Sequence, residues 1–248
     1  MMILKTSEQI EQMKAAGAIL AACHRKIAKL IRPGITTWEI DQFVEEYLAE
    51  HGATPEQKGY HGYPYATCAS VNDVICHGFP RKEPLLEGDI VTIDMVVNLN
   101  GWLADSAWSY AVGTVSPEAK RLLEVTEKSL YLGIEQAVAG NRIGDISHAI
   151  QSYAQQHGYS VVREFTGHGI GQSIHEEPYV PHFGPPGRGP LLKEGMVITI
   201  EPMLNIGTYH ATIDEDGWTA RTRDGKLSAQ YEHTIAITAD GPLILTKQ

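Results

Sequence analysis

Apolar residues recur at helical spacing along the first thirty positions of the chain, which predicts one long amphipathic helix. The stripe consists of Ile10, Met13, Gly17, Leu20, Ile27 and Leu30. Thr6 and Gln9 have the spacing of a capping box at the start of this helix, and Pro33-Gly34 ends it. A second amphipathic helix is predicted from about Thr37 to His51-Gly52.

The second half of the chain repeats this order of predicted elements. A helix begins at Ser116-Pro117 and is expected to close at Gly140. The segment "GDISHAIQSYAQQHG" then echoes "TWEIDQFVEEYLAEHG" from the first half. The predicted helices of the two halves therefore form matching pairs.

The offset between matching positions is nearly constant. Gly34 and Gly140 lie 106 positions apart, and the Glu-Gly pair at 87–88 recurs 107 positions later. We therefore predict an α+β fold of two similar halves, near 1–113 and 114–248, that close around a shared sheet as one domain.

A strand is predicted for "EGDIVTIDM", residues 87–95, and it contains an acidic residue. Asp94 falls at a position where the side chain of a strand would be packed. Asn100-Gly101 is a strong hairpin signal, and the return strand is predicted over 102–110. With a two-residue loop, Asp105 becomes the diagonal neighbour of Asp94, with backbones roughly 7–8 Å apart. A four-residue loop would place the two aspartates directly opposite, so either loop keeps them on one face of the sheet.

The second half supplies a matching pair of acids. "EGMVITIEPM", residues 194–203, repeats the earlier phrase with Glu201 in the place of Asp94. The predicted strand "SAQYEHTIAIT" has Glu232 and Thr234 on one face. Each half is therefore expected to offer two carboxylates on strands.

Four carboxylates that converge would need a compensating charge. An unpaired buried carboxylate costs several kcal/mol or takes up a proton, whereas carboxylates shared by two hard divalent ions are stable as anions. An exposed face with hydrated acids is the alternative. His168 lies among glycines in "TGHGIGQSIHEEP" and is the expected nitrogen ligand, and His175 could reach the same cavity. His77, in "NDVICHGFP", fits a structural role and a catalytic role equally well.

Other histidines lack such a setting, and surface or helix-cap roles are expected for them. They are His24, His51, His148, His157, His182, His210 and His233.

Composition narrows the class of protein. The chain has 248 residues, of which 43% are hydrophobic and 20% charged, as in a soluble globular protein. A net charge of -10 argues against nucleic-acid binding, and no apolar run is long enough to span a membrane. Three cysteines without a CxxC pair and an N-terminus without a signal-peptide core predict a cytoplasmic location.

Taken together, these motifs resemble the type I methionine aminopeptidases, which have the pita-bread (creatinase/aminopeptidase) fold. The motifs are "NDVICHG", "TID", "ADS", "GHGIG", "IHEEP", "IEPM" and "YEHT", in this order, and the resemblance covers residues 1–248 as a single catalytic domain. About thirty residues between Glu201 and Glu232 leave no room for the helical insertion of the type II branch. No zinc-binding or ribosome-directed extension is expected before the first helix.

The resemblance implies two divalent metal ions, cobalt, manganese, iron or zinc, and a role for each site residue. The implied metal ligands are Asp94, Asp105, His168, Glu201 and Glu232. Asp105 and Glu232 would bridge the two ions, His168 and Glu201 would complete one ion's shell, and Asp94 would chelate the other. His77 and His175 would be catalytic, with Glu201 as the general base. The implied methionine pocket consists of Tyr60, Tyr63, Cys68 and Trp218.

The resemblance also implies the substrate and its surroundings. The expected reaction removes the N-terminal methionine from nascent polypeptides, with a small second residue preferred and the ribosome as one place of encounter. A monomer with no nucleic-acid or membrane partner is expected. Gly59 and Ile174 depart from residues common in bacterial members, a Cys and an aromatic, and are expected to alter the shape of the pocket or access to it.

Two other functions fit the same ligand types. An Xaa-Pro aminopeptidase or prolidase would share the metal residues, but those enzymes usually carry a sizeable N-terminal domain. A non-catalytic binding protein with this fold would typically have lost metal ligands, and all five are present here.

Overall fold

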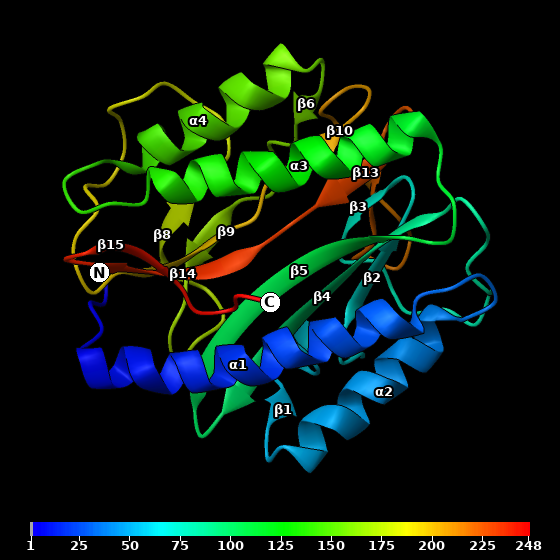
Figure 1. Cartoon of the computed structure of the whole chain (residues 1–248), viewed down its shortest axis with the longest axis horizontal. Coiled ribbons are helices and arrows are strands. Elements are labelled where there is room, and N and C mark those ends of the chain that lie inside the picture. The colour runs from blue at the N-terminus through cyan, green and yellow to red at the C-terminus, as the bar shows by residue number, and fades with distance from the viewer. Residues whose placement is uncertain (1) are drawn as a thin grey trace.

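The computed structural model describes residues 2–248. Two pairs of helices lie on the outside of the molecule with the strands between them (Figure 1). One pair is α1 (Ser7–Leu30) and α2 (Thr37–Glu50), and the other is α3 (Pro117–Glu135) and α4 (Ile143–Gln156). No helix in this part of the chain is long and apolar enough to cross a membrane.

The strands fall into four sheets in which all the pairings are antiparallel. The first half contributes β1 (Thr54–Pro55), β2 (Cys68–Val71), β3 (Val74–Cys76), β4 (Ile90–Leu99) and β5 (Trp102–Ala111), with the 3₁₀ turn η1 (Tyr60–Gly62). The second half contributes β6 (Ser160–Val161), β7 (Gly167–Gly169), β8 (Glu176–Val180), β9 (Val197–Ile200), β10 (Met203–Asn205), β11 (Ala211–Ile213), β12 (Ala220–Thr222), β13 (Ser228–Gln230), β14 (His233–Thr238) and β15 (Gly241–Ile244). The largest sheet has the order β15-β14-β9-β7-β8.

The predicted hairpin of the first half is confirmed. β4 pairs with β5 so that Asp94 lies opposite Ala107 and Asp105 lies opposite Val96. The two loop residues, Asn100 and Gly101, have φ values of 54° and 84°, as a type I′ turn requires. Asp94 and Asp105 are therefore diagonal neighbours on one face of the sheet.

The two long strands predicted around the second pair of acids are each interrupted, which corrects the sequence prediction. Glu201 and Pro202 separate β9 from β10, and Tyr231 and Glu232 separate β13 from β14. β9 and β14 belong to the five-stranded sheet, whereas β10 and β13 pair in a neighbouring sheet. Proline has no N–H to continue a ladder, so the chain leaves the first sheet at Glu201.

The start of α1 agrees with the sequence prediction, whereas the end of α3 differs from it. At the start of α1, the Gln9 amide donates to Thr6 Oγ1 (3.3 Å) and the Thr6 amide donates to Gln9 Oε1 (3.0 Å), as the predicted capping box requires. α3 ends at Glu135 rather than at Gly140. The Asn141 side chain donates to the Gln136 carbonyl (3.0 Å) and satisfies the end of the helix early.

A polar seam joins the halves where β5 lies beside β14. Thr234 Oγ1 accepts a hydrogen bond from the Asp105 amide (3.0 Å) and donates one to the Asp105 carbonyl (2.8 Å). Nearby, Ser106 Oγ donates to the Glu232 carbonyl (2.8 Å). Thr246 Oγ1 in turn accepts from the Thr234 amide (3.2 Å), so the C-terminal segment lies directly behind the seam. These bonds fix the register of the two acid-bearing segments.

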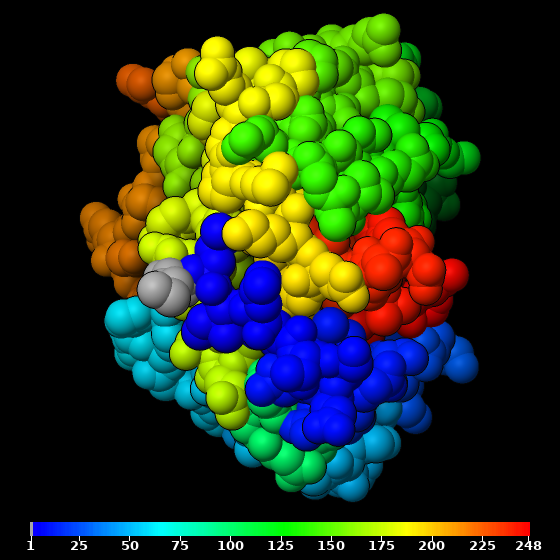
Figure 2. Space-filling model, turned by 90° about the vertical axis from the view of Figure 1, so that its left-hand side faces the viewer, coloured from blue at the N-terminus to red at the C-terminus, as the bar shows by residue number. Residues whose placement is uncertain are grey.

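The two ends of the chain pack against the body of the molecule. Figure 2 shows the N-terminal residues in blue against the yellow segment that contains Gly195, whose carbonyl accepts from the Lys5 amide (2.7 Å). At the other end, Leu245 passes so close to α1 that a Cβ at Gly17 would overlap its carbonyl oxygen.

We predict that Gly17→Ala destabilises the protein by about 1–3 kcal/mol, because the added methyl overpacks the contact with Leu245. The sign is diagnostic, since glycine to alanine in an unobstructed helix normally stabilises by about 1 kcal/mol. Denaturant unfolding would measure the change, with the exposed Gln12→Ala on the same helix as the control. A Gly17→Ala protein at least as stable as the parent would contradict this packing.

Candidate metal centre and active site

A cavity of about 290 Å³ lies between the two halves, and both halves contribute to its walls. All of the predicted site residues line it: Tyr60, Tyr63, Cys68, His77, Asp94, Asp105, His168, His175, Glu201, Trp218 and Glu232. No lysine or arginine is among the lining residues in the described part of the chain. The cavity therefore combines several acids with no cationic side chain.

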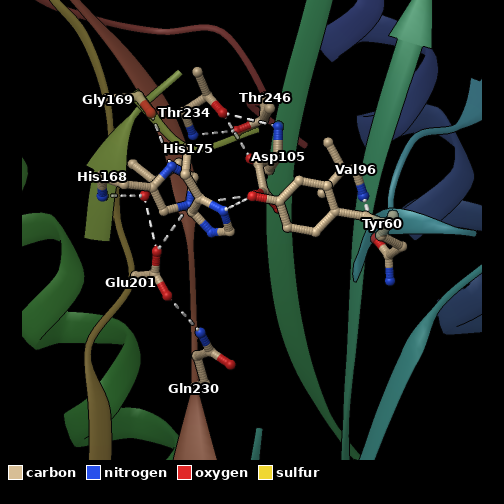
Figure 3. A network of polar contacts seen from close by, with 12 residues as sticks. Tyr60, Val96, Asp105, His168, Gly169, His175, Glu201, Gln230, Thr234 and Thr246 are labelled. Atoms are coloured by element: carbon tan, nitrogen blue, oxygen red, sulfur yellow. Dashed lines mark hydrogen bonds and ion pairs between the residues drawn. The ribbon is translucent and has the colours of Figure 1, made fainter. Parts of the chain in front are cut away.

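The acids and His168 form the deepest part of this cavity. Asp105, Glu201 and Glu232 are buried, and Asp94 is partly buried. Ligand atoms of Asp105, His168 and Glu232 all lie within 4.8 Å of one another. His168 Nε2 lies 3.7 Å from Asp105 Oδ2 and 3.6 Å from Glu201 Oε1 (Figure 3).

Burial raises the pKa of each of these carboxyl groups. It raises the pKa of Asp94 to about 7 and that of Glu201 to about 8. The pKa values of Asp105 and Glu232 are raised well above their usual range, first by burial and then by the charges of the neighbouring acids. Without a cation, the group cannot be fully ionised at neutral pH.

Two buried oxygens in this group make no hydrogen bond within residues 2–248: Asp105 Oδ1 and Glu232 Oε1. On the nitrogen side, His168 Nδ1 is 3.0 Å from the Gly169 carbonyl and must donate to it, which leaves Nε2 as a free acceptor that faces the acids. Burial lowers the pKa of His168 to about 3, so the imidazole is neutral, as a metal ligand must be. This oxygen-rich set with one imidazole fits divalent metal ions.

Three side chains that the sequence analysis did not assign to the site hold Glu201 in place. Thr199 Oγ1 donates to Glu201 Oε1 (2.8 Å), and Gln230 Nε2 donates to Glu201 Oε2 (3.3 Å). The Glu201 amide donates to His182 Nε2 (3.1 Å). Thr199 could have been found from the sequence, because it lies two residues before Glu201 on the same strand face. His182 and Gln230 lie on other segments and give no such signal.

The surface or cap role expected for several histidines is wrong for His24, His182 and His233, each of which is fully buried. The His24 ring contacts the Tyr110 hydroxyl (2.8 Å) and the Ser106 carbonyl (3.1 Å). Such partners satisfy a neutral imidazole, so it can be buried at little cost.

The two histidines implied by the resemblance, His77 and His175, line the same cavity as the acids. His77 adopts a left-handed backbone with φ 56°, and burial, with a smaller effect of His175, lowers its pKa to about 4. Its ring is edge-on to Phe165. His175 is open to solvent, and its Nδ1 lies 2.8 Å from the Tyr60 hydroxyl. Its ring centroid is 4.4 Å from that of His168.

An apolar pocket adjoins the acids. The rings of Tyr63 and Trp218 meet edge to face at 5.1 Å, and Cys68 lies opposite Asp94 in the sheet. Phe165, Cys76 and Met203 extend this wall, and the sequence analysis did not identify them.

The effects of the two predicted departures, Gly59 and Ile174, both stay predictions. Gly59 is exposed and is not among the residues that line the cavity. Gln57, two residues earlier, lines it instead, with Oε1 accepting from the Val96 amide (2.7 Å). Ile174 is buried and lines the cavity, so its effect on the pocket stays a prediction.

Comparison with known proteins places this site in context. The sequence model of metallopeptidase family M24 matches residues 11–239. A methionine aminopeptidase of Clostridium perfringens is 51% identical over 99% of both chains, and methionine aminopeptidase 1 of Bacillus subtilis is 49% identical over 100% of both.

Solved structures agree with these sequence matches. The crystal structure of methionine aminopeptidase from Rickettsia prowazekii has a TM-score of 0.98 at 44% identity, over 99% of this chain and all of that one. Prolidase from Pyrococcus furiosus has a TM-score of 0.79 at 25% identity, over 99% of this chain and 66% of that one. These similarities confirm the predicted pita-bread fold.

The raised carboxyl pKa values predict how the metal-free protein responds to pH. Between the unfolded pKa of about 4 and the folded values of about 7 and 8 for Asp94 and Glu201, the folded state binds more protons than the unfolded state. Its stability should therefore fall as pH rises through this window, by about 1.4 kcal/mol per pH unit for each extra proton. Urea unfolding in chelator from pH 5 to pH 8 would measure the slope.

The variants Asp94→Asn and Glu201→Gln should flatten this slope, whereas the exposed Glu135→Gln should retain the parental slope. A metal-free protein that becomes more stable from pH 5 to pH 8 would show that these acids are not held in a low-dielectric cluster.

Proposed function

The chain belongs to metallopeptidase family M24, and on that basis we propose that it removes the N-terminal methionine from nascent proteins and peptides. The observation that carries this proposal is one cavity that unites a cluster of acids and His168 with an apolar aromatic pocket. A small second residue would be preferred, as the resemblance to the type I methionine aminopeptidases implies.

The protein binds divalent metal, and we propose that five residues hold two ions: Asp94, Asp105, His168, Glu201 and Glu232. Metal binding by Asp105 and Glu232 would satisfy Asp105 Oδ1 and Glu232 Oε1, which are buried and have no hydrogen-bond donor within residues 2–248. His168 and Glu201 would complete the shell of one ion, in agreement with the 3.6 Å between their ligand atoms. Asp94 would chelate the other. Cobalt, manganese, iron and zinc all suit this donor set.

When bound, divalent ions in such a site lower the pKa of water and polarise a carbonyl group. Glu201 would act as the general base, taking a proton from the attacking water and passing it to the leaving amine. Its two oxygens are held by Thr199 and Gln230, so the carboxylate has a fixed orientation toward the cavity. Glu201 lies at a strand break, where its side chain is free of the pleat.

His175 and His77 would contact the peptide itself. Burial lowers the pKa of His77, and partial desolvation beside the cavity lowers that of His175, so each is a neutral hydrogen-bond donor at physiological pH. His175 would donate to the carbonyl oxygen as negative charge develops there. His77 would contact the side of the peptide nitrogen and position the substrate.

The pocket of Tyr63, Cys68 and Trp218 would receive the methionine side chain. Cys68 lies opposite Asp94 in the sheet, so a side chain in this pocket would bring its own free amine toward Asp94. That arrangement would make the enzyme an exopeptidase. Aromatic rings and a thiol provide polarizable contacts for a thioether.

We further propose that the protein acts in the cytoplasm as a monomer and meets chains that leave the ribosome. The nearly constant offset between the two halves supports a single catalytic domain built from a duplication of about 1–113 and 114–248.

Replacing Asp105 or His168 with alanine should abolish both metal uptake and activity on a Met-Ala peptide, because each removes a ligand from the cluster. Metal analysis of the purified variants and a peptide assay would test this, with the exposed Glu135→Ala as control. Met-Ala should be cleaved well and Met-Lys poorly, and faster cleavage of Ala-Pro than of Met-Ala would favour a prolidase-type enzyme instead.

His175→Ala should lower kcat by about 10²–10³ while the metal content stays that of the parent, because the residue stabilises charge on the carbonyl oxygen. The exposed His148→Ala on α4 is the matched control and should leave kcat unchanged. Loss of metal in His175→Ala, or an unchanged kcat, would refute the assigned role.

A further inference from the structure

We propose that Tyr60 is a positioning residue that fixes the tautomer and the orientation of His175, in addition to forming part of the pocket wall. The inference rests on the catalytic role proposed for His175. In this proposal the Tyr60 hydroxyl orients His175, whereas the Tyr60 ring contacts the substrate.

The contact joins the two halves across the mouth of the cavity. The Tyr60 hydroxyl lies 2.8 Å from His175 Nδ1, and the two ring centroids are 5.4 Å apart. Figure 3 shows the Tyr60 ring reaching toward His175 from the opposite side of the site. The hydroxyl has no other hydrogen-bond partner among residues 2–248.

The turn that presents Tyr60 is tightly fixed. Gly59, His61 and Gly62 all have positive φ, at 93°, 48° and 87°. The Gly59 amide donates to the Tyr63 carbonyl (2.7 Å), and the Tyr63 amide donates back to the Tyr60 carbonyl (2.9 Å). A non-glycine residue such as His61 persists in this region only when its surroundings impose it. The turn therefore holds the Tyr60 hydroxyl in a fixed position beside His175 Nδ1.

The backbone of His175 is held from the other side. The carboxylate of the next residue, Glu176, pairs with the buried Lys5 and accepts from the Gln172 amide (3.2 Å). These bonds anchor the segment before β8, so rotation of the imidazole is the main freedom left to His175. The bond from Tyr60 removes that freedom.

The same bond decides which ring nitrogen bears the proton. A neutral imidazole has one donor and one acceptor nitrogen. A phenol is a stronger acid than a neutral imidazole N–H, so the favoured arrangement has the Tyr60 O–H donating to Nδ1. The proton of His175 then resides on Nε2, the nitrogen that remains available to a substrate carbonyl oxygen.

The first test observes the tautomer without any reaction. In metal-free protein, ¹⁵N NMR of the ring nitrogens of His175, assigned by their loss in His175→Ala, should show Nε2 protonated and Nδ1 bare. Tyr60→Phe should bring the two signals toward the average of exchanging tautomers. A protonated Nδ1 in the parent protein, or spectra unchanged by Tyr60→Phe, would overturn the proposal.

The second test separates positioning from binding. Tyr60→Phe keeps the ring and should lower kcat about tenfold, the effect of losing one hydrogen bond, with KM within about twofold of the parent. In the His175→Ala background it should have no further effect, because its target is absent. Tyr65→Phe, five positions along the same loop and outside the cavity, is the matched control.

A raised KM with unchanged kcat would mean that Tyr60 only forms the pocket, and an additive loss in the double variant would mean that it acts apart from His175. Either result would overturn the proposal. If the parent protein fails to cleave methionyl peptides, the proposed function fails while the NMR measurement still decides the tautomer.

Discussion

The structure depends on one electrostatic constraint, the convergence of four carboxylates in a cavity that no lysine or arginine lines within the described chain. In a medium of low dielectric constant, their mutual repulsion would have to be relieved by protons or by metal cations. The raised pKa values of Asp105 and Glu232 express this conflict directly. A site of this kind is costly as a purely structural feature, so its presence argues for bound cations rather than for stability.

The four acids are held by two kinds of local structure, a continuous hairpin and two strand breaks. Asp94 and Asp105 are fixed by the pleat and register of one continuous hairpin. Glu201 and Glu232 lie where strands break, so their positions depend on additional hydrogen bonds. The Thr199 and Gln230 side chains orient Glu201, and the Ala107 carbonyl accepts from the Glu232 amide (2.8 Å). The hairpin gives the site rigidity, and the breaks let the two glutamates turn out of the sheet toward the cavity.

This division explains how much the sequence could predict. The Asn100-Gly101 loop is a local signal, so the register of the hairpin and the diagonal placement of Asp94 and Asp105 followed from it. The break at Glu232 leaves no local signal, because residues before and after it alternate as one strand would. His182 looked like a loop residue, and only the tertiary contact with the Glu201 amide explains its burial. The sequence therefore predicted features that depend on neighbouring residues, and it did not predict the contacts between distant segments.

The two halves are alike in fold but unlike in their contribution to the site. The apolar wall draws on both halves, with Tyr63 and Cys68 from the first and Trp218 and Phe165 from the second. Cys68 lies opposite Asp94 in the sheet. His168 and His175 both come from the second half. A duplication alone would give two equivalent sites, one around each pair of acids. The acids of both halves instead meet in one cavity, which also contains the apolar pocket and His168, His175 and His77. Bonds that cross between the halves, such as those of Thr234 with Asp105, are then what keeps the two contributions in register.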